Sequence, residues 1–380
     1  MTARVLIVAG SDSGGGAGIQ ADIKAVTMLG GHAMTAITAI TAQNTREVTA
    51  VHPVPTEMVM AQIDAVVSDI GVDAVKIGMI GSPDTAMALA ERLQRPDMSG
   101  AAVVFDPVMI TTSGAALADP GTVTAFGALM RRAAVATPNL DELKALGGEE
   151  AILAHGCALL VKGGHAEGEM VIDRLLEREA GEVARWEAPR IHTPHMHGTG
   201  CTLASAIATG LADGMPLEPA IARARDFVRL ALHDAPGLGS GHGPMGHQKV
   251  RNDGLFTGPA LNQISLPAQD YAASVAFYRQ LGLTQIVDSP DKGYARFEAA
   301  NGVTLSVHVG AGEAGGAITY LESGALDAWV AYLARRGVRF EHMPRDESWG
   351  WREARLNDPA GNILCLFQAA EYRRYPPWRI

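Results

Sequence analysis

Residues 197–210 read His-Gly-Thr-Gly-Cys-Thr-Leu-Ala-Ser-Ala-Ile-Ala-Thr-Gly, a turn of small residues that leads directly into a predicted helix. At a helix N-terminus the first backbone N–H groups have no partner within the helix, and the peptide dipoles add up to a partial positive charge. Gly198 and Gly200 keep the backbone bare, so an anion can approach several N–H groups at once. The stretch therefore predicts an anion-binding helix tip.

Cys201 lies within this turn. A helix N-terminus stabilises negative charge, so we expect the thiolate form of Cys201 to be favoured. The turn of Gly198, Thr199 and Gly200 would hold the negative charge that develops on a phosphoryl group. Cys201 beside it could take a proton. The alternative interpretation is a tight turn that buries an inert cysteine, because short glycine motifs occur widely.

Composition narrows the classes of protein. The chain has 380 residues, of which 47% are hydrophobic and 19% charged, so a sizeable core is feasible. A formal net charge of −10 argues against nucleic acid or an anionic membrane as the main partner. The three cysteines lie far apart, which fits a reducing cytoplasm. No apolar run is long enough for a signal-peptide core or a membrane span.

The aromatic residues indicate two domains. Of 20 aromatic residues, 16 follow residue 250, including all seven tyrosines. A glycine-rich stretch, 237–246, separates the two regions; it contains a formal GxGxxG match, which has no preceding strand and no following helix. We predict a first domain over residues 1–247, a linker over 248–258 and a second domain over 259–380.

The first region alternates short apolar runs with helical patterns, which predicts an α/β fold whose mostly parallel sheet is covered by helices on both faces. Its predicted strands are Val5–Ala9, Met34–Ile40, Ala74–Ile77, Ala102–Phe105, Val135–Thr137 and Ala158–Val161. Its predicted helices are Ala17–Leu29, Thr56–Ser68, Asp84–Leu93, Thr122–Arg132, Leu140–Leu146, Thr202–Leu211 and Leu217–His233. The second region repeats a strand–helix–strands pattern and predicts an α+β domain of two βαβββ modules.

Polar and glycine-rich segments follow several predicted strands, where ligands collect in parallel sheets. The loop from Gly10 to Asp22 would let a ligand approach the backbone, and Asp22 can accept a hydrogen bond from a substrate hydroxyl. The amide of Gln43 carries both a donor and an acceptor, which suits the edge of a heteroaromatic ring. Met79 can pack on a flat ring, although a lone methionine is more often part of the core.

Later strand ends carry charged groups. Asp106 and Glu142 can hold Mg²⁺ through waters, and Asn139 lies three residues before Glu142 on the same helix face. Asn139 also fits a helix N-cap, and both roles can hold together. Lys162, followed by two glycines, supplies a cation and open backbone for a phosphate chain. The sequence has no GxxxxGK[ST] motif of P-loop enzymes.

These segments together resemble the hydroxymethylpyrimidine/phosphomethylpyrimidine kinases of thiamine biosynthesis, which have a ribokinase-like fold. The resemblance covers residues 3–247 and rests on nine segments in order: 9–12, 15–22, 42–45, 76–79, 106–109, 137–140, 162–165, 197–202 and 241–244. It implies ATP-dependent phosphorylation of the hydroxymethyl group of the pyrimidine and then of the monophosphate. Family habit also implies a homodimer.

The resemblance assigns roles by position. It places Gly10, Asp22, Gln43, Met79 and Val108 around the pyrimidine. It assigns ATP and Mg²⁺ binding to Asp106, Asn139, Glu142 and Lys162, and makes Cys201 the base within the anion hole of Gly198, Thr199 and Gly200. One departure is visible: where the family places a full helix, between Leu146 and Ala158, only 149–155 is available.

The second region resembles the vicinal-oxygen-chelate superfamily of glyoxalases and bleomycin-resistance proteins, through Phe277–Leu283 and Asn357–Leu364. The resemblance implies a divalent metal site. Its matching positions are Gln263, Ser306, Ala317 and Cys365, of which Ala317 cannot be a ligand and Ser306 is a poor one; His308 is a possible substitute. A metal site therefore competes with a small-ligand or dimerisation module.

Two alternative functions remain open from the sequence. A pyridoxal or pyridoxine kinase on the same scaffold would differ in how Gln43 and Met79 read the ring. A ligand-sensing protein with a decayed kinase half is disfavoured because the 198–201 turn, Lys162 and Glu142 are intact.

Overall fold

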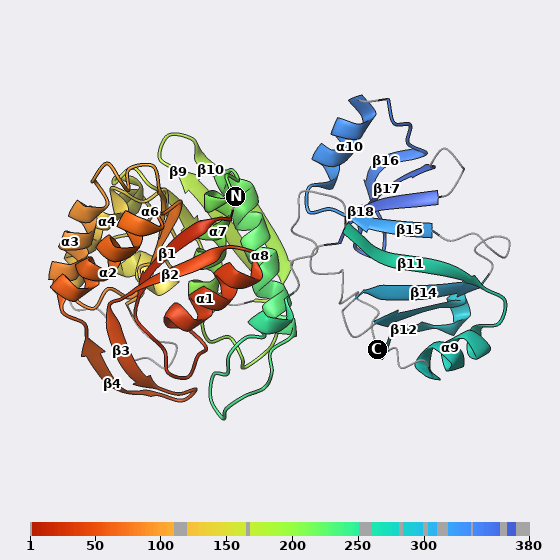
Figure 1. Cartoon of the computed structure of the whole chain (residues 1–380), viewed down its shortest axis with the longest axis horizontal. Coiled ribbons are helices and arrows are strands. Elements are labelled where there is room, and N and C mark those ends of the chain that lie inside the picture. Colours follow the sequence, from red (N-terminus) through yellow and green to blue (C-terminus); the bar gives the residue numbers. More distant parts are fainter. Residues whose placement is uncertain are drawn as a thin grey trace. The chain divides into compact units, whose positions relative to one another are not determined.

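The structure is a computed structural model (Figure 1) that describes residues 2–109, 120–164, 168–250, 260–280, 284–298, 303–309, 318–335, 337–357 and 363–369. It divides into two compact units, Met1–Val250 and Arg251–Ile380, called here the first and the second unit. Most of the predicted linker, 251–258, lies outside the described residues. Within the described ranges, the helices are all too short or too polar to cross a membrane.

The first unit is built on a sheet whose strands are β1 (Arg4–Ala9), β2 (His32–Ile37), β5 (Ala74–Ile77), β6 (Ala102–Phe105), β7 (Val135–Ala136), β8 (Ala158–Val161), β9 (Met170–Glu177) and β10 (Gly181–Pro189). In the described part of the chain the order is β10-β9-β8-β7-β6-β5-β1-β2. Pairing is parallel from β2 to β8 and antiparallel at β9 and β10. Val5 to Ala9 are all buried, as expected for a strand covered on both faces.

Helices cover both faces of this sheet (Figure 1). They are α1 (Gly18–Met28), α2 (Thr56–Asp69), α3 (Pro83–Arg92), α4 (Pro120–Met130), α5 (Leu140–Ala145), α6 (Glu149–Leu153), α7 (Thr199–Ala212) and α8 (Leu217–His233). On one face α1 and α7 lie on the strands, and α8 packs on α7. On the other face α2, α3 and α4 bury one apolar cluster with β1, β5 and β6. The predicted ribokinase-like α/β architecture is confirmed.

The main differences from prediction in the sheets concern four strands, of which β4 and β10 are exposed and β9 is largely buried. The predicted strand 34–40 is two elements, β2 and β3 (Ala39–Gln43), and β3 pairs with an unpredicted β4 (Val48–Pro53) in a separate two-stranded sheet. β9 and β10 were also not predicted. β4 and β10 are mostly exposed and carry too few apolar residues to show a buried-strand pattern. The short helix expected before Ala158 is the five-residue α6.

The second unit has its own sheet, made of β11 (Ala260–Ala268), β12 (Thr284–Ser289), β13 (Tyr294–Glu298), β14 (Thr304–Val309), β15 (Ile318–Glu322), β16 (His342–Asp346), β17 (Arg352–Asn357) and β18 (Ile363–Gln368). Its described strands lie in the order β12-β13-β14-β11-β15-β18-β17-β16. β11 and β15 pair antiparallel and join two modules, each with one helix, α9 (Tyr271–Gln280) or α10 (Leu326–Arg335). The predicted pair of βαβββ modules is confirmed.

Candidate active site

The turn at 197–201 forms the N-terminus of α7. The helix begins at Thr199, three residues earlier than predicted, so Thr199, Gly200 and Cys201 form its first turn. Gly198 is the N-cap and has a left-handed backbone with φ of 86°. A Cβ on Gly198 would lie 1.9 Å from the carbonyl oxygen of Gly16, so only glycine fits there. The tip of α7 is therefore held against the loop that follows β1.

An ion pair faces this helix tip. Lys162 Nζ lies 2.9 Å from Asp106 Oδ1, and the side chains are 13% and 3% exposed. A Cβ on Gly200 would lie 3.3 Å from Lys162 Nζ and 3.6 Å from Asp106 Oδ2. The first turn of α7, a lysine and a carboxylate thus meet at one place, as the sequence predicts for a phosphate site.

Strand topology explains this convergence. Asp106 follows β6, Thr137 follows β7 and Lys162 follows β8, and these parallel strands are neighbours. The Thr137 hydroxyl donates to Asp106 Oδ1 at 3.0 Å. Burial opposes ionisation of Asp106, yet Lys162 and Lys76 hold the pKa of its carboxyl below the ordinary value. Asp106 is therefore an anion at neutral pH.

Asn139 and Glu142 form a capping box at the start of α5. The Glu142 N–H donates to Asn139 Oδ1 at 2.9 Å, and the Asn139 N–H donates to Glu142 Oε2 at 2.8 Å. The N-cap alternative for Asn139 is thus confirmed. Burial raises the pKa of Glu142 to about 7, and nearby Asp106 adds to the rise while Lys162 opposes it. A cation beside both carboxylates would favour the ionised form of Glu142.

Cys201 corrects one expectation. Burial raises the pKa of its thiol to about 11, and the opposing effect of Lys76 is smaller. The predicted stabilisation of the thiolate is wrong for the ligand-free protein, because desolvation of the sulfur outweighs the positive charges near the helix tip. Cys201 stands at the predicted place and is a neutral thiol at pH 7.

A buried ion pair lies beneath the site. Lys76 Nζ lies 2.9 Å from Asp22 Oδ2, and both side chains are fully buried. The hydroxyl of Ser205, on α7, donates to Asp22 Oδ1 at 2.7 Å. Both carboxylate oxygens of Asp22 therefore have protein partners, and a substrate hydroxyl would have to share one of them. Lys76 received no role from the sequence, although a lysine inside an apolar strand is a readable signal.

Residues expected around the ring lie at the ends of β1, β5 and β6. Met79 is 8% exposed, and a Cβ on Gly10 would lie 2.0 Å from its terminal methyl group. The missing side chain of Gly10 thus provides the space that Met79 occupies. Val108 is half-buried two residues after Asp106. These residues lie at the carboxyl-end edge of the parallel strands, as the ion pair of Lys162 and Asp106 does.

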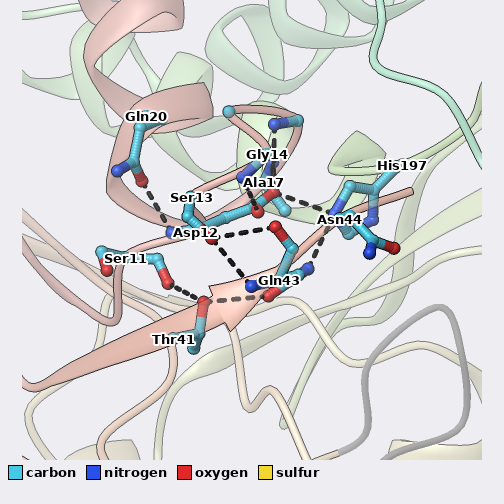
Figure 2. A network of polar contacts seen from close by, with 12 residues as sticks. Ser11, Asp12, Ser13, Gly14, Ala17, Gln20, Thr41, Gln43, Asn44 and His197 are labelled. Atoms are coloured by element: carbon cyan, nitrogen blue, oxygen red, sulfur yellow. Dashed lines mark hydrogen bonds and ion pairs between the residues drawn. The ribbon is translucent and has the colours of Figure 1, made fainter. Parts of the chain in front are cut away.

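Gln43 belongs to a polar network that the sequence did not reveal (Figure 2). Its amide lies 3.0 Å from His197 Nε2, and the same ring nitrogen lies 3.0 Å from Asp12 Oδ2. Asp12 also accepts backbone N–H groups of its own loop, those of Gly14, Gly16 and Ala17. The network joins the end of β3, the loop after β1 and the residue that precedes the α7 cap.

The glycine-rich stretch 237–246 has a packing role. Cβ atoms on Gly239 and Gly241 would lie 2.3 Å from the Thr45 hydroxyl and 2.2 Å from the Thr45 carbonyl oxygen. The His242 N–H donates to the same carbonyl at 2.8 Å. Gly239 and Gly241 thus allow the loop to lie against the turn after β3. The other two glycines of the GxGxxG match are equally tightly packed, since a Cβ on Gly243 would lie 2.3 Å from His195 Nδ1 and one on Gly246 would lie 2.0 Å from the Asp234 carbonyl oxygen.

The metal candidates of the second unit do not meet. Gln263 donates to the Ser306 hydroxyl at 2.9 Å, and its own oxygen has no hydrogen-bond partner among the described residues. Cys365 lies on β18, which β15 separates from the strand of Gln263, and its thiol donates to the Glu353 carboxylate at 3.3 Å. His308 is in register with Pro267, four residues along β11 from Gln263, or about 13 Å. In the described ranges no three His, Cys, Asp or Glu residues gather as metal ligands, and Ala317 lies outside those ranges.

Comparisons with known proteins agree with the two units. Residues 12–246 match the family model described as phosphomethylpyrimidine kinase, and residues 260–366 match that of the glyoxalase/bleomycin resistance protein/dioxygenase superfamily. A hydroxymethylpyrimidine/phosphomethylpyrimidine kinase of Rhizobium meliloti (strain 1021) is 47% identical over 264 residues. The match covers 65% of this chain and 97% of that protein.

Solved structures give the same result for the fold. The phosphomethylpyrimidine kinase of Clostridium difficile 630 is 36% identical with a TM-score of 0.51, over 59% of this chain and 97% of that one. The pyridoxal kinase of Staphylococcus aureus, in complex with AMP-PCP and pyridoxal, is 28% identical with a TM-score of 0.58, over 66% and 96%. The chain therefore belongs to the phosphomethylpyrimidine kinase family, and a domain of the glyoxalase/bleomycin-resistance superfamily follows its kinase domain.

Proposed function

We propose that the first unit transfers the γ-phosphoryl group of ATP to the hydroxymethyl group of 4-amino-5-hydroxymethyl-2-methylpyrimidine, and then to the monophosphate. One observation carries the proposal: the bare first turn of α7, capped by Gly198, faces the ion pair of Lys162 and Asp106. The match to hydroxymethylpyrimidine/phosphomethylpyrimidine kinases supplies the substrate.

The proposed chemistry is mainly positioning and neutralisation of charge. The N–H groups of Gly200 and Cys201 would bind the oxygens of the transferring phosphoryl group, and Lys162 would balance their charge. The Thr199 N–H, which donates to the Met196 carbonyl at 3.3 Å, would join them by exchanging that partner. The substrate hydroxyl oxygen bonds to the γ-phosphorus while the bond to the ADP oxygen breaks. The hydroxyl proton leaves as the new bond forms, and Cys201 is its proposed acceptor in the thiolate form.

Mg²⁺ fits the carboxylates near this tip. Asp106 is ionised, and Glu142 is close enough to Asp106 for the two charges to oppose each other, which a divalent cation would relieve. Asp106 and Glu142 would hold the ion through waters, with Asn139 fixing the Glu142 carboxylate from the capping box. The ion would supply further charge neutralisation for the triphosphate.

On the substrate side, Gly10, Met79 and Val108 would bound the flat ring, and Gln43 would read its edge. Asp22 would line the pocket beside the substrate hydroxyl while it stays paired with Lys76. A pyridoxal kinase is the second candidate, because a Staphylococcus aureus pyridoxal kinase shares this fold. A sensor with a decayed kinase half is disfavoured because Lys162, Asp106 and the α7 tip are assembled.

The test is turnover by the full chain with ATP and Mg²⁺, comparing hydroxymethylpyrimidine, its monophosphate and pyridoxine. We expect kcat/KM for the pyrimidine to exceed that for pyridoxine by at least about tenfold, the scale of one well-formed recognition contact. The reverse preference would make the protein a pyridoxine kinase, and no turnover of any of them would overturn the kinase proposal.

The second unit is proposed to be a small-ligand or dimerisation module, since its candidate ligands Gln263, His308 and Cys365 do not converge. A homodimer and a cytoplasmic location remain predictions. Light scattering of the full chain would measure its mass in solution and so test the predicted homodimer.

A further inference from the structure

The network around His197 fixes the orientation of one amide, and this orientation bears on substrate choice. Figure 2 shows Asp12, Gln43 and His197 converging from three segments. One terminal atom of the Gln43 amide lies 3.0 Å from His197 Nε2 and the other lies 3.3 Å from the Thr41 hydroxyl oxygen. The oxygen and nitrogen of a planar amide have nearly the same shape, so the partners decide which is which.

The proton on His197 Nε2 determines which atom of the Gln43 amide faces the imidazole. Its Nε2 lies 3.0 Å from Asp12 Oδ2. Although burial opposes ionisation, the hydrogen bonds from His197 and the backbone hold the pKa of Asp12 below its ordinary value. A carboxylate only accepts hydrogen bonds, so Nε2 must carry a proton, whether the ring is neutral or charged. A protonated Nε2 has no lone pair, so the amide atom that faces it must be an acceptor that shares the single Nε2 proton with Asp12 Oδ2 in a three-centre hydrogen bond. That atom is the oxygen of Gln43.

The hydroxyl proton of Thr41 independently determines which atom of the Gln43 amide faces Thr41. The Thr41 hydroxyl has a single proton, which it donates to the Ser11 carbonyl at 2.8 Å. Toward Gln43 it can only accept, so the amide atom that faces Thr41 is the nitrogen. His197 and Thr41 therefore require the same orientation of the Gln43 amide, with its oxygen toward His197 and its nitrogen toward Thr41. This orientation is the reverse of the one drawn in Figure 2.

His197 is itself held against the helix tip. A Cβ on Gly16 would lie 2.6 Å from the imidazole Cδ2, and the His197 N–H donates to the Gly243 carbonyl at 3.2 Å. The next residue is Gly198, the cap of α7. The position of Nε2 is therefore set relative to the site where the phosphoryl group would bind.

We propose that His197 and Thr41 lock the Gln43 amide, which makes His197 a positioning residue that selects an aminopyrimidine edge. The lock leaves one N–H and one oxygen lone pair for the ligand, in a set order. A ring nitrogen next to an amino group offers the complementary acceptor and donor. This inference rests on the proposed function, in which Gln43 reads the ring.

The order of donor and acceptor decides which way round the ring lies. If the amide were reversed, a 4-aminopyrimidine would have to turn over to keep both hydrogen bonds. Its 5-hydroxymethyl group would then move away from the α7 tip. A locked amide therefore aligns the attacking oxygen as well as binding the ring, whereas pyridoxine has no amino group beside a ring nitrogen and gains less from the lock.

The kinetic test compares His197→Phe, which keeps a ring without a donor, with His197→Gln, which can place an N–H near the position of Nε2. We expect H197F to lower the ratio of kcat/KM for hydroxymethylpyrimidine over pyridoxine by about tenfold or more, with a lower kcat for the pyrimidine because part of it binds turned over. H197Q should keep the ratio within about threefold of wild type, as expected when one donor replaces another. Thr41→Val should lower the ratio independently.

Lys24→Met is the matched control, because Lys24 donates to the Gly15 carbonyl at 2.7 Å and holds the same loop without entering the network. Its ratio should equal that of wild type. An equal loss for both substrates in H197F would show a purely structural role and overturn the proposal.

A spectroscopic readout separates this inference from the proposed function. In the full chain with ¹⁵N-labelled histidine, the resonances missing in H197Q belong to His197, and they should show a protonated Nε2. An unprotonated Nε2 overturns the lock. A protonated Nε2 in an enzyme that does not phosphorylate the pyrimidine would leave the lock standing and refute the proposed function.

Discussion

Cys201 is the proposed catalytic base, and its thiol pKa of about 11 leaves only about one molecule in ten thousand as the thiolate at pH 7. If the thiolate accepts the substrate proton, kcat should rise about tenfold per pH unit from pH 7 to 9. Cys201→Ala should slow phosphorylation by about tenfold or more and flatten this profile, with an unchanged melting temperature. Unchanged turnover in the variant would remove Cys201 from the mechanism.

Glu142 should make the first unit lose stability as the pH rises. Its folded-state pKa of about 7 lies above the ordinary value of 4.5, so its contribution is full below pH 4.5 and is lost as the pH passes 7. Glu142→Gln keeps a capping-box side chain and removes this loss, which amounts to at most about 3 kcal/mol. Without nucleotide or Mg²⁺, the variant should melt above wild type at pH 8, and the gap should narrow at pH 5. An equal gap at both pH values would contradict the assignment.

The pair of Lys76 and Asp22 is expected to be strongly coupled, because both side chains are fully buried. Lys76→Met leaves the Asp22 carboxylate without its cation and should destabilise the first unit by about 3–5 kcal/mol. Adding Asp22→Asn should recover part of that loss, because no buried charge then remains unpaired. Chemical denaturation of both variants measures the coupling, and additive losses would show that the pair is not coupled.

At the scale of elements, the α7 tip contains two glycines with different constraints. Gly198→Ala places a Cβ 1.9 Å from the Gly16 carbonyl oxygen at a φ of 86°, so the tip must shift. We expect a loss of about 1–3 kcal/mol of stability together with most of the activity. Gly200 lies inside the helix, where a Cβ would lie 3.3 Å from the end of the Lys162 side chain and 3.6 Å from Asp106 Oδ2. Gly200→Ala should leave the melting temperature unchanged and raise the KM for ATP. Equal effects of the two substitutions would show that the tip is not fixed at Gly198.

Elements with a continuous apolar pattern were predicted closely. The bounds of β5, β6, β8 and α8 agree with the prediction residue for residue, because their buried runs end at clear polar or glycine positions. β4 and β10 were missed because their exposed faces carry polar and charged residues whose pairing depends on a neighbouring strand. Edge strands of this kind are defined by tertiary contacts more than by their own composition.

At the scale of the whole molecule, the first unit should work alone. The 264 residues matched to the Rhizobium meliloti kinase cover 97% of that protein, which therefore lacks a counterpart of the second unit. A chain ending at Val250 should fold cooperatively and retain kcat within about threefold, since the candidate site lies wholly within the first unit. Circular dichroism and turnover of the truncated chain test this. A folded chain without activity would show that the second unit completes the site.

The sequence by itself determined the two-part organisation, the parallel sheet and the helix tip at Gly198–Cys201, because apolar periodicity and glycine positions are local properties. It also placed Asp106, Lys162, Asn139 and Glu142 at strand ends that parallel topology brings together. Only the tertiary structure decided the ionisation of Cys201 and Glu142 and the pairing of Lys76 with Asp22. It likewise decided the contact of His197 with Asp12 and Gln43, 185 and 154 residues apart in the chain. Burial and long-range hydrogen bonds set these properties, and neither can be read from neighbouring residues.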